Sequence, residues 1–124
     1  MAHLPYVDGF VTPVRSDNRD AYLAVATISA EIFHDNGALS VVEAWEDDVA
    51  DGKVTDFHRA VAIVPGEIVV FSWVTWPDKA TREAGMAAMM ADSRMKNPEM
   101  PFDGKRMIFG GFQAVLATGD NAPD

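Results

Sequence analysis

The stretch from Ile68 to Trp76 constrains the fold more than any other part of this sequence. It reads Ile-Val-Val-Phe-Ser-Trp-Val-Thr-Trp, so apolar side chains occupy both the odd and the even positions. Because neighbouring side chains on a strand point to opposite faces of a sheet, such a strand is buried on both sides. Much of the stretch from Met107 to Leu116 has the same property. The sequence therefore predicts a sheet that must be covered on both faces.

The first third of the chain predicts a strand and a helix. Tyr6 to Thr12 is rich in aromatic and β-branched residues and is stopped by Pro13, which cannot donate a hydrogen bond within a sheet. A cap at Ser16 or Asp17 begins the helix, and Gly37 suits the left-handed position after its last turn. The apolar face of this helix comprises Tyr22, Val25, Ala26, Ser29, Ile32 and Phe33.

The middle of the chain predicts three further strands around an acidic turn. Leu39 to Trp45 forms a short strand, and the acidic stretch from Glu46 to Gly52 has the composition of a turn. Phe57 to Val64 and Glu67 to Trp76 have strand composition, and Pro65-Gly66 suits the centre of a type II turn between them. We therefore expect an antiparallel hairpin over residues 57–76.

A second helix and a last strand complete the predicted order. Asp78 is placed to cap the helix, and Asn97-Pro98 ends it. The buried stripe of this helix comprises Ala84 or Gly85, Met86, Met89 and Met90, with Met95 as a further candidate. Asp103-Gly104 makes a turn, and Met107 to Leu116 forms the last strand.

This order of elements leaves one face of the sheet uncovered. It is the order of a ferredoxin-like split βαβ sandwich, an α+β fold with an antiparallel sheet, in which right-handed crossovers place both helices on one face. The other face then exceeds the roughly few hundred Å2 of contiguous apolar surface that a soluble monomer exposes. A two-fold homodimer packing sheet against sheet is the simplest cover. We expect one such domain over residues 1–117 and a frayed polar tail over residues 118–124.

Composition and charge exclude several classes of function. The 124 residues include no cysteine, which excludes disulfides and thiolate metal sites. The net charge of -9 would repel a phosphate backbone, so nucleic acid is not an expected partner. No stretch approaches the ~18 apolar residues of a membrane helix, and Met1 to Pro5 lacks the pattern of a secretory signal. We therefore expect a cytoplasmic protein without a membrane partner.

Several stretches of the sequence resemble those of the YbaA-like family of small bacterial proteins. They are Tyr6 to Val11, Asp51 to Phe57, Val70 to Trp73 and Met100 to Ile108, with Gly110-Gly111-Phe112 completing the last. They are long, ordered and spaced as in that family, and the resemblance covers nearly the whole chain. It implies a ferredoxin-like subunit that forms a dimeric α/β barrel, but no established activity and no catalytic residues.

Two groups of residues are candidates for a ligand site. Asp8 lies between apolar residues on a predicted strand, where a buried carboxylate must find partners or change its pKa. It is either a general base or ligand anchor, or it is paired with Arg59 or Arg106 or hydrogen-bonded to the backbone. Arg106 is also a candidate to bind an anionic ligand if it faces inward.

The second group is aromatic and contains one acid. Glu43 and Trp45 on one strand, with Phe71 and Trp73 on another, either line a pocket for a planar organic ligand or pack as core or dimer interface. The candidate ligand-binding residues are therefore Asp8, Glu43, Arg59, Trp73 and Arg106.

Neither a metal nor a cofactor is expected. His3, His34 and His58 are scattered without ligand spacing, which argues against zinc and against an axial haem ligand. The acidic loop around Asp47 to Asp56 lacks the pattern of an EF-hand, and Phe102 to Arg106 lacks that of a P-loop.

Three functions are consistent with these observations. The first is a homodimeric small-molecule-binding protein with a cavity in each subunit between the sheet and the partner. The second is a cofactor-independent oxygenase or isomerase with Asp8 or Glu43 as base, which requires a cavity of roughly a few hundred Å3 holding a carboxylate with a raised pKa. The third is a structural or interaction protein, in which side chains fill the sheet face and leave no cavity.

Overall fold

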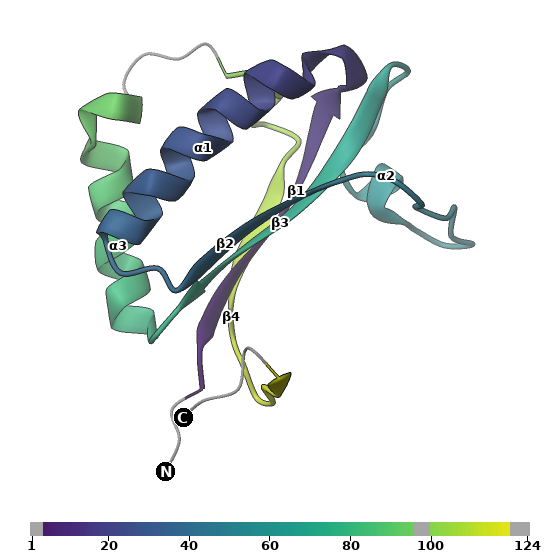
Figure 1. The fold of residues 1–124 in the computed structure, drawn as a ribbon. Helices are drawn as coiled ribbons and strands as arrows, with labels where there is room; N and C mark the ends of the chain where they lie inside the picture. Colours follow the sequence, from purple (N-terminus) through teal and green to yellow (C-terminus); the bar gives the residue numbers. More distant parts are fainter. Residues whose placement is uncertain (1–3, 96–99, 120–124) are drawn as a thin grey trace.

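The computed structural model describes residues 4–95 and 100–119. A four-stranded antiparallel sheet in the order β2-β3-β1-β4 carries two long helices on one face (Figure 1). The strands are β1 (Tyr6–Arg15), β2 (Ser40–Trp45), β3 (Glu67–Trp76) and β4 (Ile108–Gln113). The helices are α1 (Arg19–Asp35), the single-turn α2 (Phe57–Ala60) and α3 (Lys79–Ala91), with 3-10 turns η1 (Ser16–Asn18) and η2 (Ser93–Met95).

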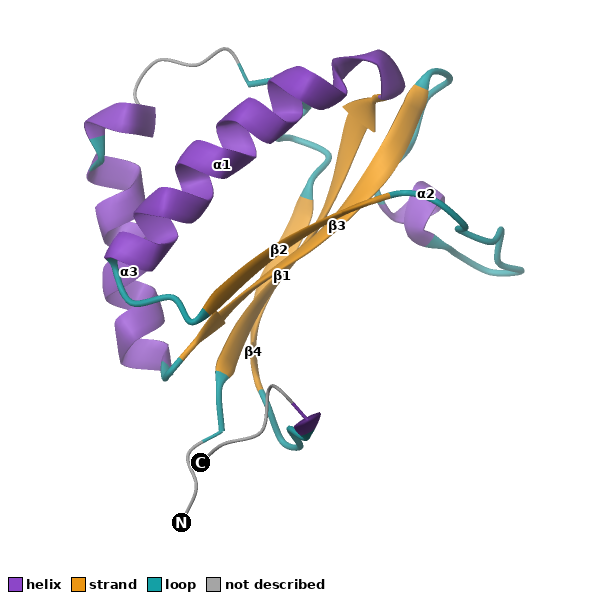
Figure 2. Cartoon of the chain, viewed as in Figure 1, coloured by secondary structure: helices purple, strands orange, loops and turns teal. Residues whose placement is uncertain are grey.

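The predicted α+β fold is confirmed. The order β2-β3-β1-β4 with antiparallel neighbours is the ferredoxin-like arrangement, and α1 and α3 form one helical layer over the sheet (Figure 2). Within the described residues the sheet is open and does not close into a barrel. The dimeric α/β barrel, which needs a second subunit, therefore stays a prediction. No helix in the described part of the chain combines the length and apolar character needed to cross a membrane.

β1 is longer than predicted, because Pro13 does not end it. The strand runs to Arg15, and Pro13 pairs with Val69 of β3. β4 pairs with β1 only as far as Val11, so the ladder on that side has already ended where Pro13 occurs. A residue without an N–H is tolerated at such an edge.

The hairpin predicted over residues 57–76 is wrong in its first half. Phe57–Ala60 forms α2, because the side chain of Asp56 caps this turn by accepting a hydrogen bond from the N–H of Arg59 at 2.7 Å. The turn at Pro65-Gly66 is present, with Gly66 at a φ of 90°. The strand that follows it pairs instead with β1 and β2.

The segment that was expected to be a strand covers one end of the sheet. Val61 is buried and packs with Val11 of β1 and Val69 of β3, and Val49 and Ile63 pack against this cluster. These strand residues face away from α1 and α3, so the segment between β2 and β3 partly covers the face that the helices leave open (Figure 1).

The first helix follows the prediction closely. α1 begins at Arg19, a turn later than the predicted cap, because residues 16–18 form η1. The positive φ of Gly37, 100°, confirms the predicted left-handed position after the helix. Four of the six predicted core positions are buried, namely Tyr22, Ala26, Ile32 and Phe33.

The second helix has the predicted cap and a narrower buried stripe. Asp78 accepts a hydrogen bond from the N–H of Thr81 at 2.7 Å, and Gly85 is buried. Met86 and Met89 pack against the core, whereas Met90 is 84% exposed, so its predicted burial is wrong. The helix ends at Ala91, where Asp92 is extended, so the predicted end at Asn97-Pro98 is wrong; these two residues lie outside the described part of the chain.

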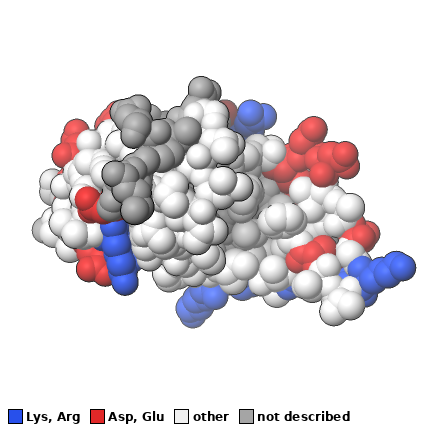
Figure 3. All heavy atoms as spheres, turned by 90° about the horizontal axis from the view of Figure 1, so that it is seen from below, with Lys and Arg blue, Asp and Glu red and all other residues white. Residues whose placement is uncertain are grey.

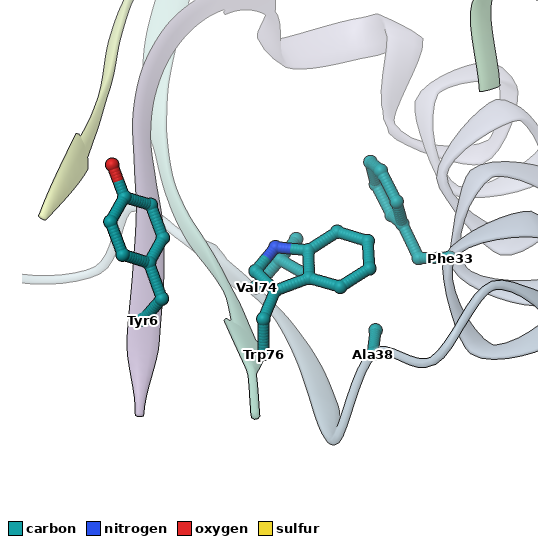
Figure 4. Close-up of a cluster of buried hydrophobic side chains, with 5 residues drawn as sticks. All are labelled: Tyr6, Phe33, Ala38, Val74 and Trp76. Carbon is teal, nitrogen blue, oxygen red and sulfur yellow. The ribbon is translucent and has the colours of Figure 1, made fainter. Parts of the chain in front are cut away.

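Trp76 is the centre of the core between sheet and helices. Its side chain is 0% exposed, and its ring meets that of Phe33 edge to face at 5.7 Å between centroids. Tyr6 lies on the other side of the indole ring, and Val74 and Ala38 complete the cluster (Figure 4).

The opposite face of the sheet carries exposed apolar side chains, as predicted. Phe71, Ile108 and Phe112 belong to this face, because they pair with Val7 or Val11 of β1. Phe112 is 63% exposed, and its ring lies close to Gly9 and Gly110. Figure 3 shows the molecule from below, relative to Figure 1. Uncharged residues fill the middle of this surface, and charged residues lie mainly toward its margin.

Gly85 allows the closest approach of α3 to the sheet, and this predicts an unusual substitution effect. A Cβ at residue 85 would overlap the indole ring of Trp76. We expect Gly85→Ala to lower the free energy of unfolding by about 1–3 kcal/mol, although alanine favours a helix over glycine by about 1 kcal/mol. Urea denaturation measures the change.

The neighbouring exposed position provides the control. Ala84→Gly is the reverse exchange at an exposed position of the same helix. It should lower the free energy of unfolding by about 1 kcal/mol through helix propensity alone. A Gly85→Ala protein more stable than wild type would contradict the packing described for α3.

Candidate functional site

A cavity of about 350 Å3 lies between the sheet and the helices α1 and α3. Its lining is mainly apolar and includes four phenylalanines, namely Phe10, Phe33, Phe102 and Phe109. Six of the seven methionines in the chain also line it, namely Met86, Met89, Met90, Met95, Met100 and Met107. Methionine is flexible and polarisable, so such a lining adapts to ligands of different shape.

A small polar group interrupts this apolar lining. The hydroxyl of Tyr22 on α1 donates a hydrogen bond to Oε1 of Glu43 on β2 at 2.6 Å. Ser72 of β3 is the register partner of Glu43 and also lines the cavity. Among the described lining residues, Glu43 is the one charged side chain.

The protein around Glu43 disfavours its ionised form. Desolvation raises the pKa of Glu43, and hydrogen bonding to Tyr22 and Ser72 only partly opposes this. Glu43 is nevertheless an exposed residue, because it lines an open cavity rather than the closed core, and solvent there reduces the cost of its charge. Burial and the adjacent carboxylate raise the pKa of Tyr22, which therefore remains a hydrogen-bond donor. Glu43 is thus placed to accept a hydrogen bond or a proton from a bound molecule.

Asp8 has a different environment, on the same face of the sheet. It is 2% exposed and is held by three donors. Arg82 of α3 binds it through Nε at 3.0 Å and Nη2 at 2.8 Å, and Nε1 of Trp76 donates to it at 2.9 Å. The predicted alternative of a paired carboxylate is therefore confirmed, but the predicted partners Arg59 and Arg106 are wrong. With its partners supplied from within the protein, Asp8 is not part of the site that we propose.

The two predicted arginines lie at the end of the sheet near the turn before β3. Both terminal nitrogens of Arg106 contact Glu67 at 2.7 Å, and its Nε contacts Asp103 at 2.8 Å. Arg59 lies beside Asp56 at 3.5 Å and is half exposed. Neither arginine lines the cavity that contains Glu43.

The predicted aromatic pocket is wrong, because its two halves lie on opposite faces of the sheet. Glu43 pairs with Ser72 and therefore faces the helices. Trp73 is one residue further along β3 and faces the open side, as does Phe71. Trp73 instead lines a separate cavity of about 320 Å3, which also includes Val7 and Leu116.

Sequence analysis missed Tyr22 and Ser72 as members of the polar group. Tyr22 was assigned to the apolar face of a helix, which is correct for its ring but ignores its hydroxyl. The concentration of methionines between residues 86 and 107 was the signal that could have located the cavity.

The candidate metal ligands do not assemble. Within residues 4–95 and 100–119, no group of three His, Asp or Glu side chains is close enough to hold a metal ion. His58 bonds Glu46 through Nε2 at 2.9 Å, and the ring of His34 contacts the carbonyl of Ala38. His3 lies outside the described residues.

Asp8 and Glu43 predict opposite responses to loss of charge. Asp8→Asn leaves Arg82 without its counter-charge, and we expect the free energy of unfolding to fall by about 3 kcal/mol. Glu43→Gln should equal or exceed wild-type stability at pH 7, because it removes a desolvated carboxylate. Urea denaturation at several pH values measures both.

The pH dependence gives a second check on Glu43. Its folded-state pKa is raised above 4.5, so the cost of ionising it is complete above the folded pKa and disappears as the pH falls to 4.5. Any advantage of Glu43→Gln should shrink over that range. Equal destabilisation by the two substitutions at pH 7 would show that Glu43, like Asp8, is a structural residue.

Comparisons with known proteins place the chain in a family. Residues 5–104 match a family described as "Protein of unknown function (DUF1428)". The chain is 51% identical over 115 residues to uncharacterized protein YbaA of Escherichia coli strain K12, covering 91% of this chain and 98% of that protein, and equally to YbaA of Shigella flexneri. A dimeric ferredoxin-like protein from an uncultured marine organism has a TM-score of 0.56 at 16% identity, over 92% of this chain and 99% of that one, and supports the fold. The chain therefore belongs to the YbaA-like family described as DUF1428.

Proposed function

We propose that the protein is a homodimer that binds a small, largely apolar organic molecule in the cavity between sheet and helices. The observation that carries this proposal is an apolar cavity of about 350 Å3 containing one carboxylate bonded to a tyrosine hydroxyl. Sites for small molecules are usually concave, of roughly 300–1,000 Å3, mainly apolar, and oriented by a few polar groups. The cavity lies on the helix side of the sheet, whereas the sequence predicted it on the partner side.

The proposed homodimer is supported by the open face of the sheet. Phe71, Ile108 and Phe112 are exposed there, and the segment between β2 and β3 covers only one end. A second copy packing face to face would bury these residues and enclose the smaller cavity beside Trp73. The structural neighbour from the marine organism is described as dimeric, which is consistent with this arrangement. A cytoplasmic location stays a prediction from the sequence.

An enzymatic role is the second candidate, and one observation favours it. A cofactor-independent oxygenase or isomerase needs a base in a cavity, and Glu43 has a raised pKa in such a position. Asp8, the other predicted base, is bound by Arg82 and Trp76. A purely structural role is the least supported, because it requires side chains to fill the open sheet face, where a cavity of about 320 Å3 lies beside Trp73.

Phe112→Glu tests the homodimer. The substitution places a charge in the proposed interface, twice in a two-fold dimer, and should raise the dimer dissociation constant by about 30-fold or more. Phe109→Glu is the matched control, because Phe109 is similarly exposed at 66% but faces the helices from the same strand. Sedimentation equilibrium measures both. A monomeric wild-type protein at micromolar concentration would refute the homodimer.

Val25→Trp tests whether the cavity holds the ligand. Val25 lines the cavity from α1, so a larger side chain there should displace a bound molecule. Native mass spectrometry of the purified protein should find an additional mass in the wild type and in Ala24→Trp, which is altered at an exposed position of the same helix, but not in Val25→Trp. A wild type without additional mass that also fails to enhance Nile red fluorescence would contradict the proposal.

A further inference from the structure

We propose that the cavity selects molecules that carry a protonated amino group on an apolar body, and that Glu43 binds this group. The inference rests on the proposed function, because it names the ligand class for the same cavity. Three features of the structure carry it: the charge of the cavity lining, the free capacity of the carboxylate, and the aromatic residues around it.

The charge of the lining is negative. Glu43 is charged, and the other described lining residues are apolar or neutral polar. Arginines elsewhere on this side of the sheet are already engaged: Arg82 binds Asp8, and Arg19 lies over the ring of Trp45 at 5.6 Å. The described part of the cavity therefore attracts a cation and repels an anion.

The carboxylate of Glu43 retains capacity for another donor. A carboxylate offers about four acceptor positions, of which Tyr22 uses one through Oε1 and Ser72 a second, so two remain. The described lining contains no cation to compensate the ionised form of Glu43, and partial desolvation raises its pKa. An ammonium group supplies both the charge and the hydrogen bonds, and the pair gains strength where water is partly excluded. A neutral hydroxyl supplies only a hydrogen bond.

Aromatic rings extend the same preference around the carboxylate. The ring of Tyr22 lies edge to face with Phe102 at 6.0 Å, and both line the cavity. Aromatic faces attract cations, and the more so when water is excluded. The methionine thioethers accommodate the apolar body, whose shape is left open by their flexibility. Together these residues describe a site for an apolar amine.

Three naphthalene compounds that differ in one group test the inference. They are 1-naphthylmethylamine, 1-naphthylmethanol and 1-naphthoate, measured by isothermal titration calorimetry against the full-length protein at pH 7.5. The amine should bind about 10-fold more tightly than the alcohol, a difference of about 1.4 kcal/mol, since charge-assisted hydrogen bonds are stronger than neutral ones. The carboxylate should bind most weakly.

Two variants separate the site from the general acidity of the protein. Glu43→Gln should abolish the advantage of the amine over the alcohol and leave the affinity for the alcohol within about 3-fold, since the amide still accepts from Tyr22. Asp47→Asn removes a charge from the exposed acidic loop, and should leave the advantage intact. If both variants reduce it equally, the preference reflects the net charge of -9 and the inference is overturned.

The outcomes distinguish this inference from the proposed function. Equal affinities for amine and alcohol in the wild type, with Val25→Trp reducing both, would overturn the amine preference and leave the cavity as a binding site. Failure of all three compounds to bind, or binding that Val25→Trp does not change, would overturn the proposed function and this inference with it.

Discussion

The two-sided burial of β3 is the constraint on which the rest of the structure depends. Its residues alternate between two apolar environments, so Val70 and Val74 pack under the helices while Val69 packs under the segment between β2 and β3. β3 lies between β1 and β2 in the sheet, so both of its backbone edges are paired as well. The face covered by α1 and α3 and the partly open face are both consequences of this one strand.

The helix face of the sheet carries two carboxylates, Asp8 and Glu43, in different environments. Asp8 is closed off by Arg82 and Trp76, and this arrangement ties α3 to the centre of the sheet. Glu43 lies on the same face but borders open space, where it has a tyrosine hydroxyl and no described cation in the cavity wall. A carboxylate in a cavity, with a raised pKa and without a counter-charge in the described wall, is typical of functional sites.

The comparison with the predictions shows which patterns carry information about function. The predicted apolar stripe of α3 is confirmed for Met86 and Met89 and is wrong for Met90, and a ligand cavity and a packed core have the same composition. Asp8 is an acid on an apolar strand. In the structure this pattern corresponds to a buried carboxylate that is bound by Arg82 and Trp76. Glu43 is a candidate from the sequence as an acid among aromatic residues, but its predicted neighbour Trp73 faces the other side of the sheet.

The sequence by itself determined the order of most elements, the α+β class, the caps at Asp78 and Gly37, and the apolar character of both sheet faces, because these follow from local spacing and side-chain type. The tertiary structure alone decided the conformation of residues 57–64, where a turn of helix capped by Asp56 replaces the first half of the strand that the composition predicts. It also decided which residues share a cavity. A shift of one residue in register moves a side chain to the opposite face, and the space left between helix and sheet depends on contacts such as Gly85 against Trp76.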